Sequence, residues 1–229
     1  MALAGGGAVA IWHDITAAGR DNFYAWHGNE HMPERVSIPG FLRGRRYVSV
    51  KGVPEFFNLY ETQSPETVRS AAYLERLNHP TPWTMKSVPD FRNVSRSLCA
   101  VALSLGPGGG GLVGTFRYSV RAGEEENHQR YLASALLPQV AQSHGVAGCH
   151  LLRADEAASA VKTVEKNVRT EDNLIPPWIM LIEGWGDGEA FTELCERQLA
   201  RSDFTRAMSL PATLALYRLQ ATAVAEAPR

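Results

Sequence analysis

The sequence contains few of the features that mark secreted, membrane or nucleic-acid-binding proteins. Its three cysteines, Cys99, Cys149 and Cys195, are an odd number at unrelated spacings, which argues against a disulfide framework or a zinc knuckle and favours a reducing compartment. No apolar stretch approaches the roughly 20 residues of a membrane-spanning helix, and the first residues lack the basic segment of a signal peptide. The charges nearly cancel, with 23 Lys and Arg against 24 Asp and Glu, so no basic face predicts a nucleic-acid partner. These absences predict a cytoplasmic protein that acts on small molecules.

One cluster of chain-breaking residues lies near the midpoint of the 229 residues. It runs from Gly106 to Gly111 as Gly-Pro-Gly-Gly-Gly-Gly, a composition typical of a flexible linker. We therefore expect a first unit over residues 1–106, a linker over 107–111 and a second unit over 112–229.

The two halves carry similar residues in the same order, which predicts an internal duplication. At a constant shift of 105 residues, Trp26 aligns with Tyr131 and Gly40 with Gly145. After an insertion of 17 residues the shift becomes 122, and Glu61 then aligns with Glu183. The inserted loop, near 155–177, is polar and charged. Such a segment is either a surface loop or a lid over a pocket.

Each half predicts the element order β-α-β-β-α-β. Periodicity and turn residues in the first half predict strands at 8–15, 42–50, 56–61 and 98–105, with helices at 21–36 and 64–78. In the second helix, Ser64 is the expected N-cap and Pro65 the first helical residue. The second half repeats the order with strands near 112–120, 149–153, 179–185 and 213–220 and helices near 125–142 and 189–200. The predicted fold class is α+β, with two tandem ferredoxin-like repeats packed sheet against sheet as one intramolecular barrel.

The densest group of ionisable residues lies on the first predicted helix. His27 and His31 are four residues apart and therefore neighbours on one helix face, which we expect to look into the barrel. The spacing differs from a His-Glu-x-x-His metal site, and no third ligand is evident, so we predict no metal. Imidazole titrates near neutral pH, so His31 is a candidate general acid or base that His27 or Glu30 orients. The alternative is that these histidines are structural.

The second half lacks this group, because Leu132 and Leu136 occupy the positions of His27 and His31. A helix that only has to pack against a sheet can use leucine. We therefore expect a single working pocket, in the first half.

Further candidates for substrate binding lie on the following strand and in nearby aromatics. Arg43, Arg45 and Tyr47 share one strand face, and a guanidinium there would hold an anionic group in a bidentate manner. Trp83 is a candidate for lining an apolar pocket. The alternatives are a solvated strand edge for the arginines and ordinary core packing for the tryptophan.

A family resemblance rests on Tyr24, on His31-x-Pro33, on Pro39-Gly40-Phe41 and on Arg45-Arg46-Tyr47. With these motifs the first half resembles the EthD-like branch of the dimeric α+β barrel superfamily, and the second half is similar to a degenerate copy of it. The resemblance implies His31 at the pocket with Tyr24 and Trp26 nearby. Members include cofactor-free monooxygenases, lactone isomerases, polyketide cyclases, decarboxylases and haem enzymes. The chain departs from the pattern in its extra His27 and Glu30, and in a second half without His-x-Pro.

The sequence therefore predicts a small-molecule enzyme that moves a proton without a metal or organic cofactor. We expect an isomerase, lyase or cyclase acting on a small aromatic, enolisable or lactone-type acid. Two alternatives from within the enzymes are a cofactor-free monooxygenase and a haem protein. A third is a non-catalytic ligand-binding or stress-response barrel. The sequence leaves open whether the chain pairs as a homodimer.

Overall fold

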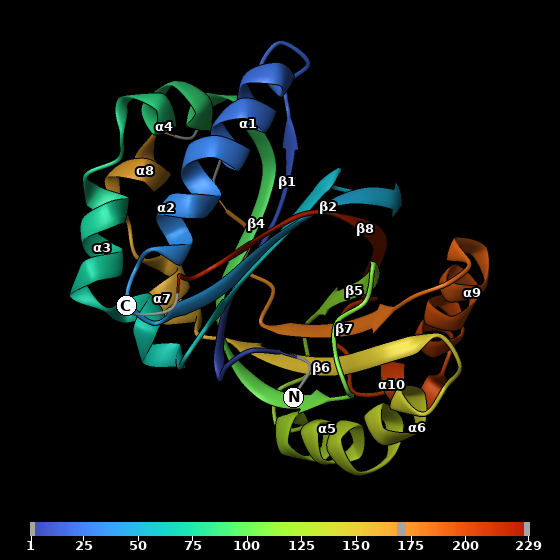
Figure 1. The fold of residues 1–229 in the computed structure, drawn as a ribbon. Helices are drawn as coiled ribbons and strands as arrows, with labels where there is room; N and C mark the ends of the chain where they lie inside the picture. The colour runs from blue at the N-terminus through green and yellow to red at the C-terminus, as the bar shows by residue number, and fades with distance from the viewer. Residues whose placement is uncertain (1–2, 169–172, 227–229) are drawn as a thin grey trace.

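Eight strands of the computed structural model, which describes residues 3–168 and 173–226, close into one antiparallel barrel (Figure 1). The strands are β1 (Gly7–Ile15), β2 (Phe41–Lys51), β3 (Phe56–Thr62), β4 (Phe91–Leu105), β5 (Leu112–Tyr118), β6 (Val146–Ala154), β7 (Trp178–Gly184) and β8 (Thr213–Val224). Around the barrel they follow the order β1-β3-β2-β8-β5-β7-β6-β4. Each half thus contributes four adjacent strands, and the halves meet where β2 pairs with β8 and β4 with β6. The predicted mixed α+β class and its barrel are confirmed.

Helices cover the outer face of the barrel on two sides (Figure 1). The first side carries α1 (Arg20–Trp26), a π-helical turn (His27–His31), α2 (Met32–Val36), α3 (Ala71–Asn78) and α4 (Pro82–Ser87). The other side carries α5 (Glu125–Tyr131), a second π-helical turn (Leu132–Leu136), α6 (Leu137–Ala141), α9 (Gly188–Leu199) and α10 (Ser202–Thr205). Among the described residues, none of these helices has the length and apolar character needed to cross a bilayer.

Alternation along the strands separates an inner core from two outer ones. Ala8, Ala10 and Trp12 of β1 point into the barrel, where they pack with inward residues of both halves such as Phe57 and Leu181. The outward residues pack under the helices instead. The prediction that the first helix looks into the barrel is therefore wrong, because side chains from the strands already fill the interior.

The insertion in the second half folds back over the first half. It contains α7 (Glu156–Ala160) and α8 (Val164–Asn167), which pack against β4 and α3 respectively. Asp155 and Thr163 cap these two helices by accepting hydrogen bonds from Ala158 N and Lys166 N. The predicted inserted loop near 155–177 is therefore partly helical, while its residues 169–172 lie outside the described part of the chain.

Two details of the second helix differ from the prediction. Residues Pro65–Arg69 form a 3-10 turn, and Ser64 makes no capping hydrogen bond. The helix proper, α3, begins only after Ser70, whose extended backbone interrupts the helix and whose hydroxyl accepts from Tyr73 N. The β-branched Thr67 and Val68 have weak helix propensity, which is consistent with this later start.

The glycine-rich segment between the halves is packed rather than free. Gly110 N donates to the Glu183 carboxylate at 3.0 Å, and a Cβ at Gly110 would lie 2.0 Å from Gly184 O. Gly106 has a φ of +109°, and a Cβ there would lie 2.3 Å from Ala147 O. These glycines therefore allow a close approach of two backbones at the end of the barrel, where the composition had predicted a flexible linker.

Candidate functional site

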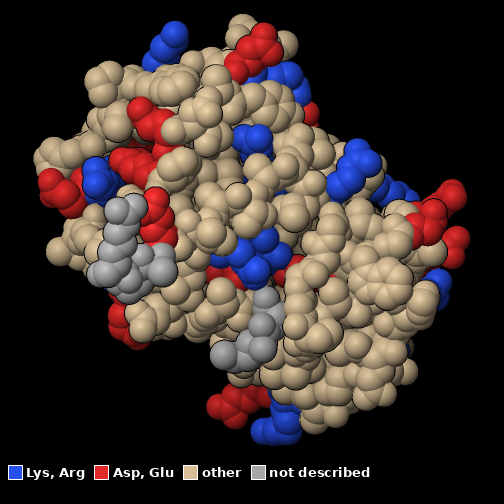
Figure 2. All heavy atoms as spheres, in the orientation of Figure 1, with Lys and Arg blue, Asp and Glu red and all other residues tan. Residues whose placement is uncertain are grey.

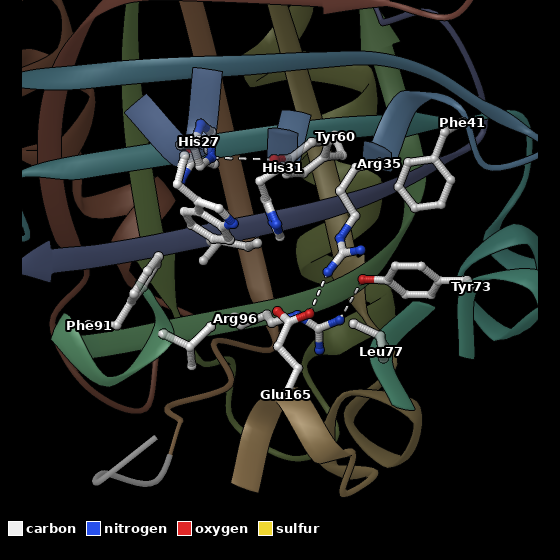
Figure 3. A pocket seen from close by; sticks show the side chains of 14 residues that line it. His27, His31, Arg35, Phe41, Tyr60, Tyr73, Leu77, Phe91, Arg96 and Glu165 are labelled. Atoms are coloured by element: carbon white, nitrogen blue, oxygen red, sulfur yellow. Dashed lines mark hydrogen bonds and ion pairs between the residues drawn. The ribbon is translucent and has the colours of Figure 1, made fainter. Parts of the chain in front are cut away.

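A small closed cavity lies between the outer face of the first-half sheet and its helices (Figure 3). Its volume is about 30 Å³, which is room for a water molecule rather than for a substrate. The side chains that surround it come from strands β1 to β4, from α1, the first π-helical turn, α2 and α3, from a 3-10 turn at Val88–Asp90 and from the inserted α8. They are Ile11, Trp26, His27, His31, Arg35, Phe41, Asn58, Tyr60, Tyr73, Leu77, Val88, Phe91, Arg96 and Glu165.

The π-helical turn brings both histidines to this cavity. His27 and His31 are 2% and 7% exposed, and their ring centroids are 5.5 Å apart. The indole of Trp26 packs at 4.3 Å from the His31 ring and donates through Nε1 to Thr84 Oγ1. This hydrogen bond ties the turn to α4. Single π-helical turns occur often at functional sites.

The contacts of His27 determine its tautomer. Arg46 Nη1 lies 3.3 Å from His27 Nδ1, and because a guanidinium can only donate, Nδ1 is the acceptor. The ring proton is then on Nε2, which lies 3.4 Å from the Tyr60 hydroxyl and donates to its oxygen. Burial, with a smaller contribution from Arg46, holds the pKa of His27 well below its ordinary value, so the ring stays neutral. Tyr60 thereby keeps its own proton available for the cavity.

A second chain of hydrogen bonds orients Asn58. His13 Nδ1 lies 3.4 Å from the carbonyl of Asp14 and donates to it, which leaves Nε2 as an acceptor. Asn58 Nδ2 donates to that nitrogen at 2.9 Å. The remaining amide oxygen, Asn58 Oδ1, is buried and has no hydrogen-bond partner among the described residues. Asn58 lines the cavity, so this oxygen is an acceptor that a bound molecule could use.

Charged residues close the far side of the cavity. In Figure 3, His31 and Arg35 point from the helix toward Arg96 and Glu165. Arg35 and Glu165 form a buried ion pair, and Arg35 also contacts Glu34 at 3.1 Å. Burial is the largest single influence on the pKa of Arg35 and lowers it, but Glu165, Tyr73, Glu34 and Tyr60 together outweigh burial, so that pKa is raised.

Arg96 is the cation that remains available in this wall. Its Nη2 donates to the Tyr73 hydroxyl at 2.7 Å, and within the described chain no carboxylate lies in ion-pair distance of its guanidinium. The described cavity wall therefore carries two guanidinium groups, Arg35 and Arg96, and one carboxylate, Glu165. That excess favours a ligand with one negative charge.

An open groove continues outward from the cavity. It encloses about 490 Å³ and shares Leu77 and Arg96 with the cavity wall. Most of its other walls are apolar. They are contributed by Val68, Leu74, Leu98, Ala157, Ala158 and Val161, together with Arg69, Asp155 and Thr163. The groove has the size of a small-molecule site.

Of the predicted site residues, the two histidines and Trp26 line the cavity, while three others lie beside it. Glu30 accepts a hydrogen bond from Thr81 at 2.6 Å on the α4 side. The Tyr24 ring packs under the Arg46 guanidinium at 5.0 Å. Trp83 donates to the Asn22 side chain at 2.9 Å. These three are not part of the cavity wall.

Arg43, Arg45 and Tyr47 point the other way, into the barrel. Arg45 forms a bidentate pair with Glu183 at 2.7 and 2.9 Å and also contacts Glu61 at 3.0 Å. Arg43 pairs with the same Glu61 carboxylate at 2.8 Å. Tyr47 is fully buried beside them. They do share one strand face as predicted, but it is the face opposite the histidines, because the helix covers the outside of the sheet.

The arginines of the cavity wall were not identified as substrate-binding residues from the sequence. Arg35 follows His31 by four residues and could have been found by the helical spacing that links the histidines. Arg96 lies on β4 outside the predicted strand 98–105, which in fact begins at Phe91. Asn58 and Tyr60 are two residues apart on β3, so both side chains point outward. This spacing would have placed them together once the outward face of the strand was known.

The cavity does not fit a haem, because a space of about 30 Å³ between Trp26, Phe91 and the Arg35–Glu165 pair cannot hold a macrocycle. The described residues contain no cluster of three or more His, Cys, Asp or Glu side chains that could hold a metal ion. On the other side of the barrel, Leu132 and Leu136 are fully buried in the second-half core.

Comparison with known proteins gives a fold but no sequence family. No family model matches the chain, and no curated protein matches it significantly. Solved structures do resemble it. An anthrone oxidase-like protein has a TM-score of 0.61 at 14% identity, covering 96% of this chain and 92% of that one. A candidate monooxygenase from Fusobacterium nucleatum has a TM-score of 0.58 at 6% identity, covering 97% and 96%. A candidate chlorite dismutase has a TM-score of 0.56 at 11% identity, covering 95% and 96%. The chain therefore has the fold of the dimeric α+β barrel superfamily.

Proposed function

We propose that the chain is a small-molecule enzyme that transfers protons without a metal or organic cofactor, with His31 as the general acid or base. The observation that carries the proposal is the closed polar cavity in which a buried imidazole, a phenol and an unpaired amide oxygen meet beside Arg96. Such a convergence of polar groups in a concave site is the usual form of an active site.

Each polar group has a role in the removal of a proton from carbon. The imidazole of His31 takes the proton, and the electron pair of the broken C–H bond moves into an adjacent carbonyl to give an enolate. The Tyr60 hydroxyl donates a hydrogen bond to that oxygen. Burial raises the pKa of Tyr60, so the phenol stays protonated and acts as a donor. Return of the proton to another carbon completes an isomerisation, while loss of a leaving group completes a lyase reaction.

The charges and the groove indicate the class of substrate. Arg96 stands at the junction of the cavity and the groove, where it can hold a carboxylate or another single negative charge. The apolar groove accommodates the body of the molecule. A small aromatic, enolisable or lactone-type acid meets both requirements. In this arrangement Arg96 has the role that Arg43 and Arg45 were predicted to have.

The cavity has to open before a substrate can reach His31. Glu165 belongs to the inserted α8 and pairs with Arg35 of α2, so separation of this pair would connect the groove with the cavity. We infer that the insertion is a lid, one of the two interpretations of its sequence. Lids of this kind exclude water from the reaction and complete the site.

A cofactor-free monooxygenase is the second candidate, favoured by the names of two proteins of the same fold, the anthrone oxidase-like and monooxygenase proteins. The same proton abstraction begins both chemistries, since the enolate is the species that would react with molecular oxygen. A non-catalytic ligand-binding barrel is the third candidate, and it needs no proton transfer.

The test combines proton exchange with oxygen consumption on enolisable aromatic acids. We expect deuterium from solvent to enter the carbon adjacent to the carbonyl in NMR spectra, at a rate that His31→Ala reduces to background with a melting temperature within a few degrees of the wild type. His79→Ala, at an exposed histidine, is the control. Uptake of oxygen by the wild type would identify the monooxygenase. Full exchange activity in His31→Ala would refute the proposal.

The duplication also belongs to this proposal. At the shift of 105 residues, the π-helical turn 27–31 falls on the turn 132–136. Gly40 and Gly145, with φ of +87° and +81°, occupy equivalent positions after each helix. We infer two repeats of one ancestral unit, an EthD-like first repeat and a second that has lost its site. Cytoplasmic location and pairing into a homodimer remain predictions.

A further inference from the structure

A second groove opens at the end of the barrel opposite the Arg45–Glu183 pair. It encloses about 490 Å³ between the end of β1, the β2–β3 turn, the start of β4 and the end of β5. The residues around it are Asp14, Val53, Pro54, Asn93, Val94, Ser95, Arg117 and Leu174. None of them lines the histidine cavity or its groove.

Arg117 is the cation of this groove and has an incomplete set of partners. Its Nη2 donates to Val53 O at 3.0 Å, and its guanidinium lies 5.1 Å from the centre of the buried Trp12 ring. Its Nε is buried and has no hydrogen-bond partner within the described part of the chain. Over the described ranges 3–168 and 173–226, no Asp or Glu lies in ion-pair distance of it. Burial lowers the pKa of Arg117, since no carboxylate offsets the desolvation.

The arginine at the other end of the barrel shows what a purely structural role requires. Arg45 also points into the barrel and stacks near an aromatic ring, Tyr47, at 5.6 Å. There, however, two carboxylates, Glu61 and Glu183, neutralise the guanidinium. Arg117 also points into the barrel beside an aromatic ring, but among the described residues no carboxylate neutralises its guanidinium. A guanidinium held in this way keeps donors that an anion from outside can use.

The one carboxylate of the groove is already engaged. Asp14 Oδ1 accepts from Glu55 N and Oδ2 accepts from Asn93 Nδ2, both at 2.7 Å. Its charge still faces the groove, so Asp14 disfavours a doubly charged ligand. A ligand with a single negative charge experiences this repulsion once, and its contact with the Arg117 guanidinium offsets it.

We propose that this groove is a binding site for a monocarboxylate with a compact apolar body, separate from the histidine cavity. The carboxylate contacts the Arg117 guanidinium, and the apolar body packs on Val53, Pro54 and Leu174. Val53 and Leu174 are 69% and 72% exposed, so a ligand would cover apolar surface that now faces water.

The test uses 4-bromobenzoate as the probe on the full chain, with the neutral 4-bromobenzamide for comparison. Calorimetry measures affinity, and the anomalous signal of bromine locates the probe in crystals. We expect a bromine peak in the groove, with the benzoate binding at least tenfold more tightly than the amide. Arg117→Met should lower the affinity of this site at least tenfold, while Arg218→Met, an exposed arginine with the same loss of charge, should not.

Two further variants separate the outcomes. Leu174→Asp places a negative charge on an exposed wall without disturbing the core, and should weaken benzoate binding even if Arg117→Met folds poorly. Arg96→Met removes the cation of the histidine cavity and should leave binding in this groove unchanged. A bromine peak found only beside Arg96, or equal binding of benzoate and benzamide, would overturn the proposal while leaving the proposed function intact.

Discussion

The Arg35–Glu165 pair allows a quantitative prediction, because both side chains are buried and they join the insertion to the helix of the site. Their side chains are 4% and 8% exposed. Removing one partner of a buried ion pair costs about 3–5 kcal/mol, mainly because the other charge stays buried. In Glu165→Gln, Glu34 still contacts Arg35 at 3.1 Å, so we expect a loss of about 2 kcal/mol. For a chain of this length that corresponds to a fall in Tm of about 4–8 °C.

Chemical and thermal unfolding at pH 7 measure this loss, and a double-mutant cycle with Arg35→Met isolates the pair. We expect the double variant to be destabilised by less than the sum of the single variants, since removing both charges leaves none buried alone. Glu156→Gln, at an exposed position of the same insertion, is the matched control and should be neutral. A change below about 0.5 kcal/mol for Glu165→Gln, the usual range for surface substitutions, would show that the insertion is not held by this contact.

Two further predictions concern Tyr60 and His128. Tyr60→Phe removes the proposed donor to the enolate oxygen and should lower kcat by about 10²–10³ with a smaller effect on KM; an unchanged kcat in steady-state assays would remove Tyr60 from the mechanism. His128 is buried beside Tyr118 and Trp178, and burial lowers its pKa to about 4. Above the unfolded-state pKa near 6.5, His128 is neutral in both the folded and the unfolded chain, so its burial does not change the free energy of unfolding. As the pH falls from 6.5 toward 4, only the unfolded chain binds the proton, so the free energy of unfolding decreases. His128→Phe should therefore reduce the loss of unfolding free energy between pH 7 and pH 4.5 by about 2 kcal/mol, measured by urea unfolding; an unchanged slope with pH would contradict the assignment.

Much of the fold was predictable because its signals are local. The first helical segment was expected at 21–36 and runs from Arg20 to Val36, and the strands β3 and β7 match their predictions within one residue at either end. The helix α4 was missed, although Thr81 caps it and Pro82 begins it in the usual manner. Its six residues are too few to give a periodic pattern.

The site was predictable only in part, because its residues come from segments that are far apart in the sequence. The histidines were found on one helix, where spacing alone makes them neighbours. The cavity residues Asn58, Tyr60 and Arg96 lie on strands. Which face of these strands points outward depends on the side that the helices cover, and this is a property of the closed barrel. Glu165 comes from an insertion more than 130 residues downstream of His31. Nothing in its own sequence context indicates that α8 would return to the first half.

The contact of Arg45 with both Glu61 and Glu183 joins the two halves of the chain through one side chain. One guanidinium of the first half satisfies a carboxylate from each half, inside a space that neither sheet could enclose alone. A change at Arg45 would therefore affect both halves. A first half produced by itself would expose its inner face, and Arg45 would lose Glu183 and retain only Glu61, which Arg43 also contacts. Outside the barrel the halves are also joined, because Glu165 of the insertion pairs with Arg35 of α2. One half can carry histidines and the other leucines, because the two π-helical turns cover different sides of the barrel (Figure 1).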